Sequence, residues 1–191
     1  LVGYIAALHD IGKLSAHFQA GWKDMAEHMA QRGLLPVIPG TVRHEITSDT
    51  IMKRIWRQCD VSSNALFFYG GILRAHHQGR FGKGDRAGDG VWKALQEELE
   101  REMRRIFLRS EEVVLPDPPK QDRGVVGALL LGVVILADWI ASGALFQDAE
   151  SWLGLSGTAE VRRRARGFLS DSGLKPVPED FGDGFTEVWP E

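Results

Sequence analysis

Side chains that commonly bind metal ions gather in four stretches of the 191-residue chain. His9-Asp10 is an adjacent pair after an apolar segment, His44 opens a second segment, and His76-His77 closes a third. Asp138 follows an apolar run from Val125 to Ala137. A buried carboxylate is costly unless it is paired. A cation is the simplest partner for Asp138, and an internal hydrogen bond to a neighbouring helix is the alternative.

Together, four histidines and two aspartates fit a site for one or two divalent ions. Mixed imidazole and carboxylate ligands suit iron, manganese, cobalt, nickel or zinc better than calcium. A bridging carboxylate can hold two ions about 3.5–4 Å apart, and such a pair acidifies a water and offsets charge on a phosphoryl group. This chemistry is typical of a phosphodiester hydrolase. The single cysteine, Cys59, excludes a structural zinc site built from thiolates.

Lys13 follows Asp10 by three residues, so the two side chains share one helical neighbourhood. The ammonium could neutralise a non-bridging phosphate oxygen or pair with the aspartate. A solvated surface lysine is the alternative, with equal weight. His17 and His28 are expected on the exposed side of an amphipathic helix, outside the site.

Helices are expected to position these side chains, because the apolar residues recur mostly at helical spacing. Phe18, Trp22, Met25 and Met29 predict one amphipathic helix. The segment 91–109 is strongly charged and has its own apolar stripe, which consists of Trp92, Leu95, Leu99, Met103 and Ile106. The other predicted helices cover about 43–59 with Thr41 as N-cap, a stretch from Ser62 or Ser63 to His77, about 124–146, and about 159–169 after Thr158.

Turn-forming residues separate the predicted helices. Residues 78–90 are rich in glycine, and three prolines break the chain at Pro116, Pro118 and Pro119. Strands are allowed only around Val113 to Leu115. The prediction is therefore an all-α irregular helical bundle with at most a minor β element. From residue 170 the chain is rich in Gly, Pro and Asp, so residues 1–169 are predicted as the domain and 170–191 as a linker or tail.

Length and composition fit one soluble globular domain, with 43% hydrophobic and 26% charged residues. The lone cysteine cannot form an internal disulfide, which favours a reducing compartment and hence the cytoplasm. No targeting segment is visible. The run from Val125 to Ala137 is too short to span a membrane and predicts a buried core helix, so no membrane partner is expected.

The net charge of −3 excludes a polybasic nucleic-acid binder, so contact with nucleic acid must come from local patches or bound cations. Two basic clusters are available. For the first, a solvated face paired with nearby glutamates is favoured; the second could follow phosphates or contact another domain. They consist of Arg101, Arg104 and Arg105, and of Arg162, Arg163, Arg164 and Arg166.

The segment Ala7 to Lys13 resembles the signature of the HD superfamily of metal-dependent phosphohydrolases. Four further motifs make the resemblance more specific. Over about residues 1–146 the chain resembles the HD nuclease domain of the type I CRISPR-associated nuclease-helicase. The motifs are Phe18-Gln19, Arg43-His44-Glu45, Ala75-His76-His77-Gln78-Gly79 and Ala137-Asp138-Trp139-Ile140-Ala141-Ser142.

This resemblance implies an all-α HD-type bundle that cuts single-stranded DNA, as an endonuclease or exonuclease, with one or two transition-metal ions. Manganese, iron, cobalt or nickel is implied before magnesium or zinc. The implied partners are a helicase domain, fused or separate, and an RNA-guided CRISPR surveillance complex. By the same resemblance, one ion is held by His9, Asp10 and Asp138, and a second ion by His44, His76 and His77, with Asp10 as the bridge between them. The resemblance also implies that Asp10 and Lys13 act in catalysis. Lys13 and Ser142 are the implied contacts to the substrate.

One departure and two alternative functions stay open. Family members carry a further histidine upstream of the HD pair, whereas none of the eight residues before His9 is histidine. We favour a natural chain that starts further upstream over the loss of this ligand. An HD phosphohydrolase acting on a small nucleotide or cyclic dinucleotide would use the same metals, but its typical Gly-Tyr-Pro element is absent after His77. A non-catalytic helical adaptor is disfavoured because all six ligand positions are intact.

Overall fold

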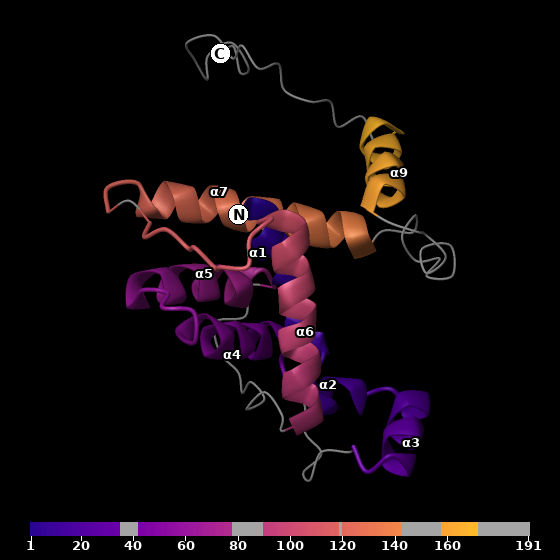
Figure 1. The fold of residues 1–191 in the computed structure, drawn as a ribbon. Helices are drawn as coiled ribbons and strands as arrows, with labels where there is room; N and C mark the ends of the chain where they lie inside the picture. The colour runs from indigo at the N-terminus through magenta and orange to yellow at the C-terminus, as the bar shows by residue number, and fades with distance from the viewer. Residues whose placement is uncertain (35–41, 78–89, 119, 143–157, 172–191) are drawn as a thin grey trace. The chain divides into compact units, whose positions relative to one another are not determined.

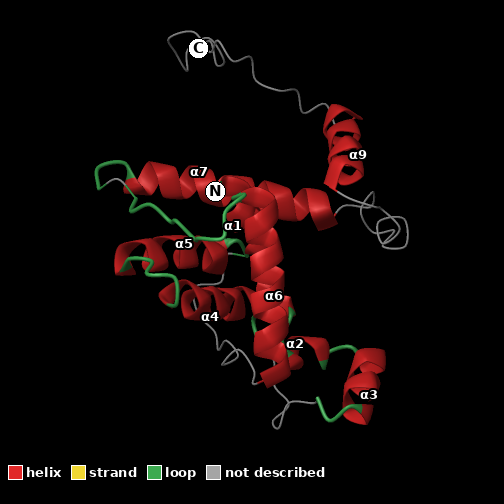
Figure 2. Cartoon of the chain, viewed as in Figure 1, coloured by secondary structure: helices red, strands yellow, loops and turns green. Residues whose placement is uncertain are grey.

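The structure is a computed structural model that describes residues 1–34, 42–77, 90–118, 120–142 and 158–171. Within these residues the chain forms helices and no strand, which confirms the all-α prediction (Figure 2). The segment Val113 to Leu115 is not a strand, although Val113 and Leu115 are buried and Val114 is exposed. The elements are α1 (Val2–Leu8), the 3-10 helix η1 (Ile11–Lys13), α2 (Ala16–Gln19), α3 (Lys23–Gln31), α4 (His44–Arg57), α5 (Ser63–Ala75), α6 (Gly90–Phe107), α7 (Arg123–Ser142) and α9 (Thr158–Asp171).

The chain divides into two compact units, Leu1–Trp139 and Ile140–Glu191. In the first unit α4 and α5 lie side by side, and η1 packs against α4 (Figure 1). Helix α1 packs against α5 and α6. Apolar side chains from these helices form the main core, including Tyr4, Ile5, Leu8, Ile51, Met52, Trp56, Leu66, Tyr69 and Leu73. In the second unit Glu160 of α9 pairs with Arg163 and Arg164, two residues of the second basic cluster.

The segment from Phe18 to Met29 forms two helices, α2 and α3, so the prediction of one continuous amphipathic helix was wrong. Helix α2 ends at Gln19, and a turn closed by bonds from the Gly21 and Trp22 amides to the carbonyls of Phe18 and Gln19 precedes α3. Glycine within a helix is unfavourable by roughly 1 kcal/mol relative to alanine, so Gly21 favours the break. Consequently Met29 is buried, whereas Trp22 is 65% exposed.

The starts of α4 and α5 differ in how they are capped. Ser62 caps α5, as predicted, because its Oγ accepts a hydrogen bond from the Ala65 amide at 3.1 Å. Helix α4 begins at His44 with Arg43 as its N-cap and without a side-chain cap bond. Thr41, the predicted N-cap, lies outside the described residues, as does the predicted loop from Gln78.

Helix α6 buries a polar face that the sequence prediction assigned to solvent. Gln96 and Glu100 are fully or almost fully buried, whereas Leu95, expected in the apolar stripe, is 41% exposed. Glu100 accepts a hydrogen bond from the Tyr4 hydroxyl at 2.5 Å, and the Trp56 indole donates to the same hydroxyl at 3.2 Å. These hydrogen bonds allow the polar face to be buried, because a buried carboxylate requires donors nearby.

Helix α7, which the sequence predicts as a buried core helix, buries one side and exposes the other. Leu130, Val134 and Asp138, each one turn apart, face the bundle. Leu129 on the outer side is 67% exposed, and Val125 is 64% exposed. With 20 residues and a mean hydropathy of 2.3, the helix is long and apolar enough to cross a membrane by length and composition alone. A core helix meets that measure too, and the buried Asp138 turned toward His9 favours this role.

We predict that Tyr4→Phe lowers the free energy of unfolding by about 1–3 kcal/mol, because it removes a donor from the buried Glu100 carboxylate. Urea unfolding followed by circular dichroism measures this change. The control is Glu102→Gln, which removes an exposed pair with Arg105 and is expected to leave the unfolding midpoint unchanged. Equal midpoints for the two variants would contradict the assignment of Glu100 to a buried network.

Candidate metal centre

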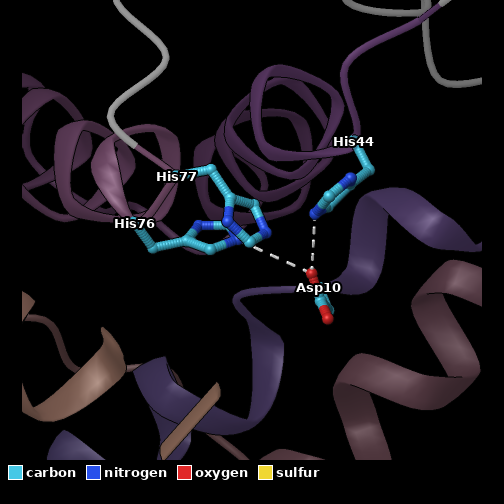
Figure 3. Close-up of side chains that lie close together, drawn as sticks. All are labelled: Asp10, His44, His76 and His77. Carbon is cyan, nitrogen blue, oxygen red and sulfur yellow. Dashed lines mark ion pairs between the residues drawn. The ribbon is translucent and has the colours of Figure 1, made fainter. Parts of the chain in front are cut away.

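The six residues predicted as ligands come from the ends of helices that meet in the first unit. His9 caps the C-terminus of α1, and Asp10 follows it. His44 is the first residue of α4, and His76 caps the C-terminus of α5 with His77 after it. Asp138 lies near the end of α7. Figure 3 shows the rings of His44, His76 and His77 around the Asp10 carboxylate.

The distances divide these residues into two groups that share Asp10. The Asp10 Oδ1 atom lies 3.0 Å from His44 Nε2 and 3.6 Å from His76 Nε2. On the other side, His9 Nε2 lies 3.3 Å from Asp10 Oδ2 and 3.4 Å from Asp138 Oδ1. Within each group the ligand atoms lie within 4.8 Å of one another; the groups are Asp10, His44, His76 and His77, and His9, Asp10 and Asp138.

Four buried polar atoms at this point have no hydrogen-bond partner in the described residues. They are His9 Nε2, Asp10 Oδ1, His44 Nε2 and His76 Nε2. An unsatisfied buried polar atom costs about 1–3 kcal/mol, so four atoms spread over two adjoining groups call for partners. Divalent cations bound within these groups would remove this cost, and the donor set suits transition metals. The residues present therefore fit a metal site.

The electrostatics keep Asp10 in the form that binds a cation. Burial alone would raise the pKa of the Asp10 carboxyl, but the close imidazoles of His44, His76 and His9 and the Lys13 ammonium hold that pKa well below its usual range. Burial also acts to lower the pKa of His9, yet its contacts with Asp10 outweigh burial and the pKa is raised. Burial, followed by repulsion from His76 and His44, lowers the pKa of His77 and favours its neutral, ligating form.

A close approach of η1 to α4 brings Asp10 beside His44. The Gly12 amide donates to the Ser48 hydroxyl at 2.8 Å, and Ser48 is fully buried. A Cβ atom on Gly12 would lie 1.9 Å from the His44 carbonyl oxygen, so only glycine fits here. The sequence analysis missed Ser48, and no single-sequence pattern distinguishes it from other helical serines.

Lys13 leaves the turn beside Asp10, with its ammonium bonded to Asp10 Oδ2 and its side chain 40% exposed. The backbone around it is fixed, because Gln19 Nε2 donates to the Lys13 carbonyl and Gln96 Nε2 donates to the Leu14 carbonyl, each at 2.8 Å. Because the Lys13 ammonium is bonded to Asp10 and the side chain is partly exposed, it can also contact a ligand bound beside Asp10.

The remaining candidate residues fall outside the two groups. His28 is exposed and His17 is half-buried. Ser142 is exposed in the last turn of α7 and belongs to the second unit, so its contact with substrate stays a prediction. In the first basic cluster, Arg105 forms the expected exposed pair with Glu102, but Arg104 is only 15% exposed and lies against the buried Glu100.

Comparisons with known proteins agree with this architecture. Residues 1–146 match the family model described as Cas3, HD domain. The CRISPR-associated endonuclease/helicase Cas3 of Thermus thermophilus is 28% identical over 151 residues, which cover 72% of this chain and 16% of that protein. A solved structure described as a CRISPR-associated protein has a TM-score of 0.67 and 22% identity, over 99% of this chain and 22% of the other, and shows the shared fold. The chain spans less than a quarter of the length of either protein.

We predict that Gly12→Ala lowers the free energy of unfolding by about 3 kcal/mol, because the added methyl meets the His44 backbone and overpacks a buried contact. Gly71→Ala is the matched control. Gly71 lies within α5 with open space around its Cα, so alanine there should stabilise the helix by about 1 kcal/mol. Thermal unfolding of both variants measures these changes. A Gly12→Ala variant as stable as Gly71→Ala would contradict the close approach of η1 to α4.

Proposed function

Because the chain belongs to the Cas3 HD domain family, we propose that it is a metal-dependent nuclease that hydrolyses phosphodiester bonds of single-stranded DNA. Four unsatisfied ligand atoms, spread over two adjoining groups that share Asp10, carry this proposal. The metal is manganese, iron, cobalt or nickel, since imidazole and carboxylate ligands together suit these ions. Residues 1–169 form the nuclease domain and 170–191 a linker.

The two groups of side chains correspond to two ion sites. His9, Asp10 and Asp138 would hold one ion, and His44, His76 and His77 would hold the second, with Asp10 shared between the two groups. Two such ions, when bound, supply acidification of a water and stabilisation of the attacking and leaving oxygens. Asp10 is suited to the bridging position because its depressed pKa keeps the carboxylate ionised across the physiological range.

Lys13 is the proposed contact to the scissile phosphate. Its ammonium is anchored on Asp10 Oδ2, so it stays within reach of any group bound at the aspartate. Because 40% of the side chain is exposed, it can also face the substrate. A positive charge in this place neutralises a non-bridging phosphate oxygen and stabilises the charge that develops in the transition state.

Burial of the ligands favours a single strand as the substrate. His9, His76 and Asp138 are at most 8% exposed, so a stiff duplex reaches the ligand atoms less easily than a single strand does. A helicase, in the same chain or separate, would supply that strand during CRISPR interference, on a target selected by an RNA-guided complex. The printed name of the Thermus relative joins endonuclease and helicase, which supports the pairing.

The test is incubation of the whole chain with circular single-stranded DNA and Mn²⁺, Co²⁺ or Ni²⁺. We expect cleavage that a chelator stops, and Asp10→Asn to reduce the rate by about 100- to 1,000-fold, because the bridging ligand is weakened. Asp49→Asn is the control, as Asp49 is a buried α4 carboxylate paired with Lys53 outside the ligand groups. Cleavage of free nucleotides but not of DNA would support the small-nucleotide alternative, and intact DNA with every ion would overturn nuclease activity.

For Lys13→Met we expect the rate of DNA cleavage to fall by about 100-fold, because a charge that acts on the transition state is removed. Mn²⁺ binding, measured by calorimetry on the same variant, should keep its stoichiometry, since the six ligands are untouched. A variant that loses an ion together with its activity would contradict a phosphate-binding role and would instead assign Lys13 to support of Asp10.

A further inference from the structure

Two of the buried histidines at the centre are fixed in the same way. His9 Nδ1 lies 2.6 Å from the Ala6 carbonyl oxygen, and His76 Nδ1 lies 2.5 Å from the Leu73 carbonyl oxygen. Both histidines cap helix C-termini, where the last carbonyls have no partner within the helix. Each ring therefore donates Nδ1–H to a free carbonyl three residues earlier, which leaves the lone pair of Nε2 for an ion.

His44 cannot be fixed in this way, because it is the first residue of α4. A helix N-terminus leaves free N–H groups, which cannot accept a proton from an imidazole. A side chain instead faces His44 Nδ1: the Oε2 atom of Glu45 lies 3.8 Å away. His44 thus lies between two carboxylates, with Nδ1 toward Glu45 and Nε2 at 3.0 Å from Asp10 Oδ1.

Glu45 is unusual for a residue in the first turn of a helix, because it is only 2% exposed. Its Oε1 atom accepts a hydrogen bond from Arg43 Nε, which compensates the buried charge and orients the carboxylate. Its other oxygen faces the imidazole. The 3.8 Å contact is electrostatic rather than a hydrogen bond, and it favours the tautomer that carries a proton on Nδ1.

We propose that Glu45 is the positioning residue for His44 and holds the ring in the orientation and tautomer in which Nε2 binds a metal ion. This inference rests on the proposed metal centre and adds to it a residue that touches neither ion nor substrate. A carboxylate behind a histidine ligand also raises the basicity of that ligand. Arg43 supports this role, because its bond to Glu45 Oε1 leaves Oε2 facing the His44 ring.

The test compares three variants of the whole chain by calorimetric titration with Mn²⁺. Glu45→Leu should weaken binding of the ion held by His44 by about 10- to 100-fold. Glu45→Gln keeps the shape of the side chain and a carbonyl dipole beside the ring but lacks the charge, so its loss of affinity should be measurable and smaller. The control Asp49→Asn alters another buried carboxylate on α4 that pairs with Lys53, and should lower the melting temperature without changing Mn²⁺ affinity.

The His44 ring gives a second readout that a merely structural role would not change. Nitrogen-15 NMR of the protein loaded with the diamagnetic ion Zn²⁺ should show a slowly exchanging Nδ1–H on His44 in the wild type, and faster exchange of this proton in Glu45→Leu. If Glu45→Leu does not fold, the affinity of Glu45→Gln decides, and a value equal to that of the wild type overturns the role of Glu45. A wild-type chain that binds no Mn²⁺ would instead overturn the proposed metal centre itself.

Discussion

Four buried ligand atoms, one from a carboxylate and three from imidazoles, lie in two adjoining groups around Asp10 and have no hydrogen-bond partner among the described residues. Burial without hydrogen bonds destabilises the metal-free fold, and the surrounding structure must offset this cost. The bundle limits that cost by placing the ligands at helix ends, where chain reversals bring side chains from distant positions together. It also supplies Lys13, which shares the charge of Asp10 from the more exposed side.

Two buried side chains of α6 bond to the chain on either side of the His9-Asp10 pair. Glu100 accepts from Tyr4, five residues before His9, and Gln96 donates to the carbonyl of Leu14, directly after Lys13. Gln96 also accepts from Arg54 of α4 at 3.0 Å, so α6 ties the HD segment to the helix that carries His44. Polar residues in a core specify position more narrowly than apolar ones, because hydrogen bonds demand defined distances and angles.

The fold class could be predicted because it depends on local patterns, whereas the grouping of the candidate ligands was an expectation from the family resemblance and not from spacing. Helical spacing marked most of the helices, and Ser62 marked the start of α5 correctly. The errors have a common physical origin. Burial of Gln96 and Glu100, and exposure of one side of α7, depend on what each helix packs against, which spacing in a single sequence does not report. The sequence assigned no role to Gly12, Ser48 or Glu45, since their roles depend on the packing of η1 against α4 and on the burial of Glu45 beside His44.

The central claim is that Asp10 joins two ion sites, and anomalous diffraction from crystals soaked in Mn²⁺ tests it most directly. The account predicts a peak within bonding distance of an Asp10 oxygen and of Nε2 of His44 and His76, and a second peak near His9 and Asp138 at higher Mn²⁺ concentration. Crystals that take up Mn²⁺ only at surface carboxylates, with the six residues unchanged, would contradict it.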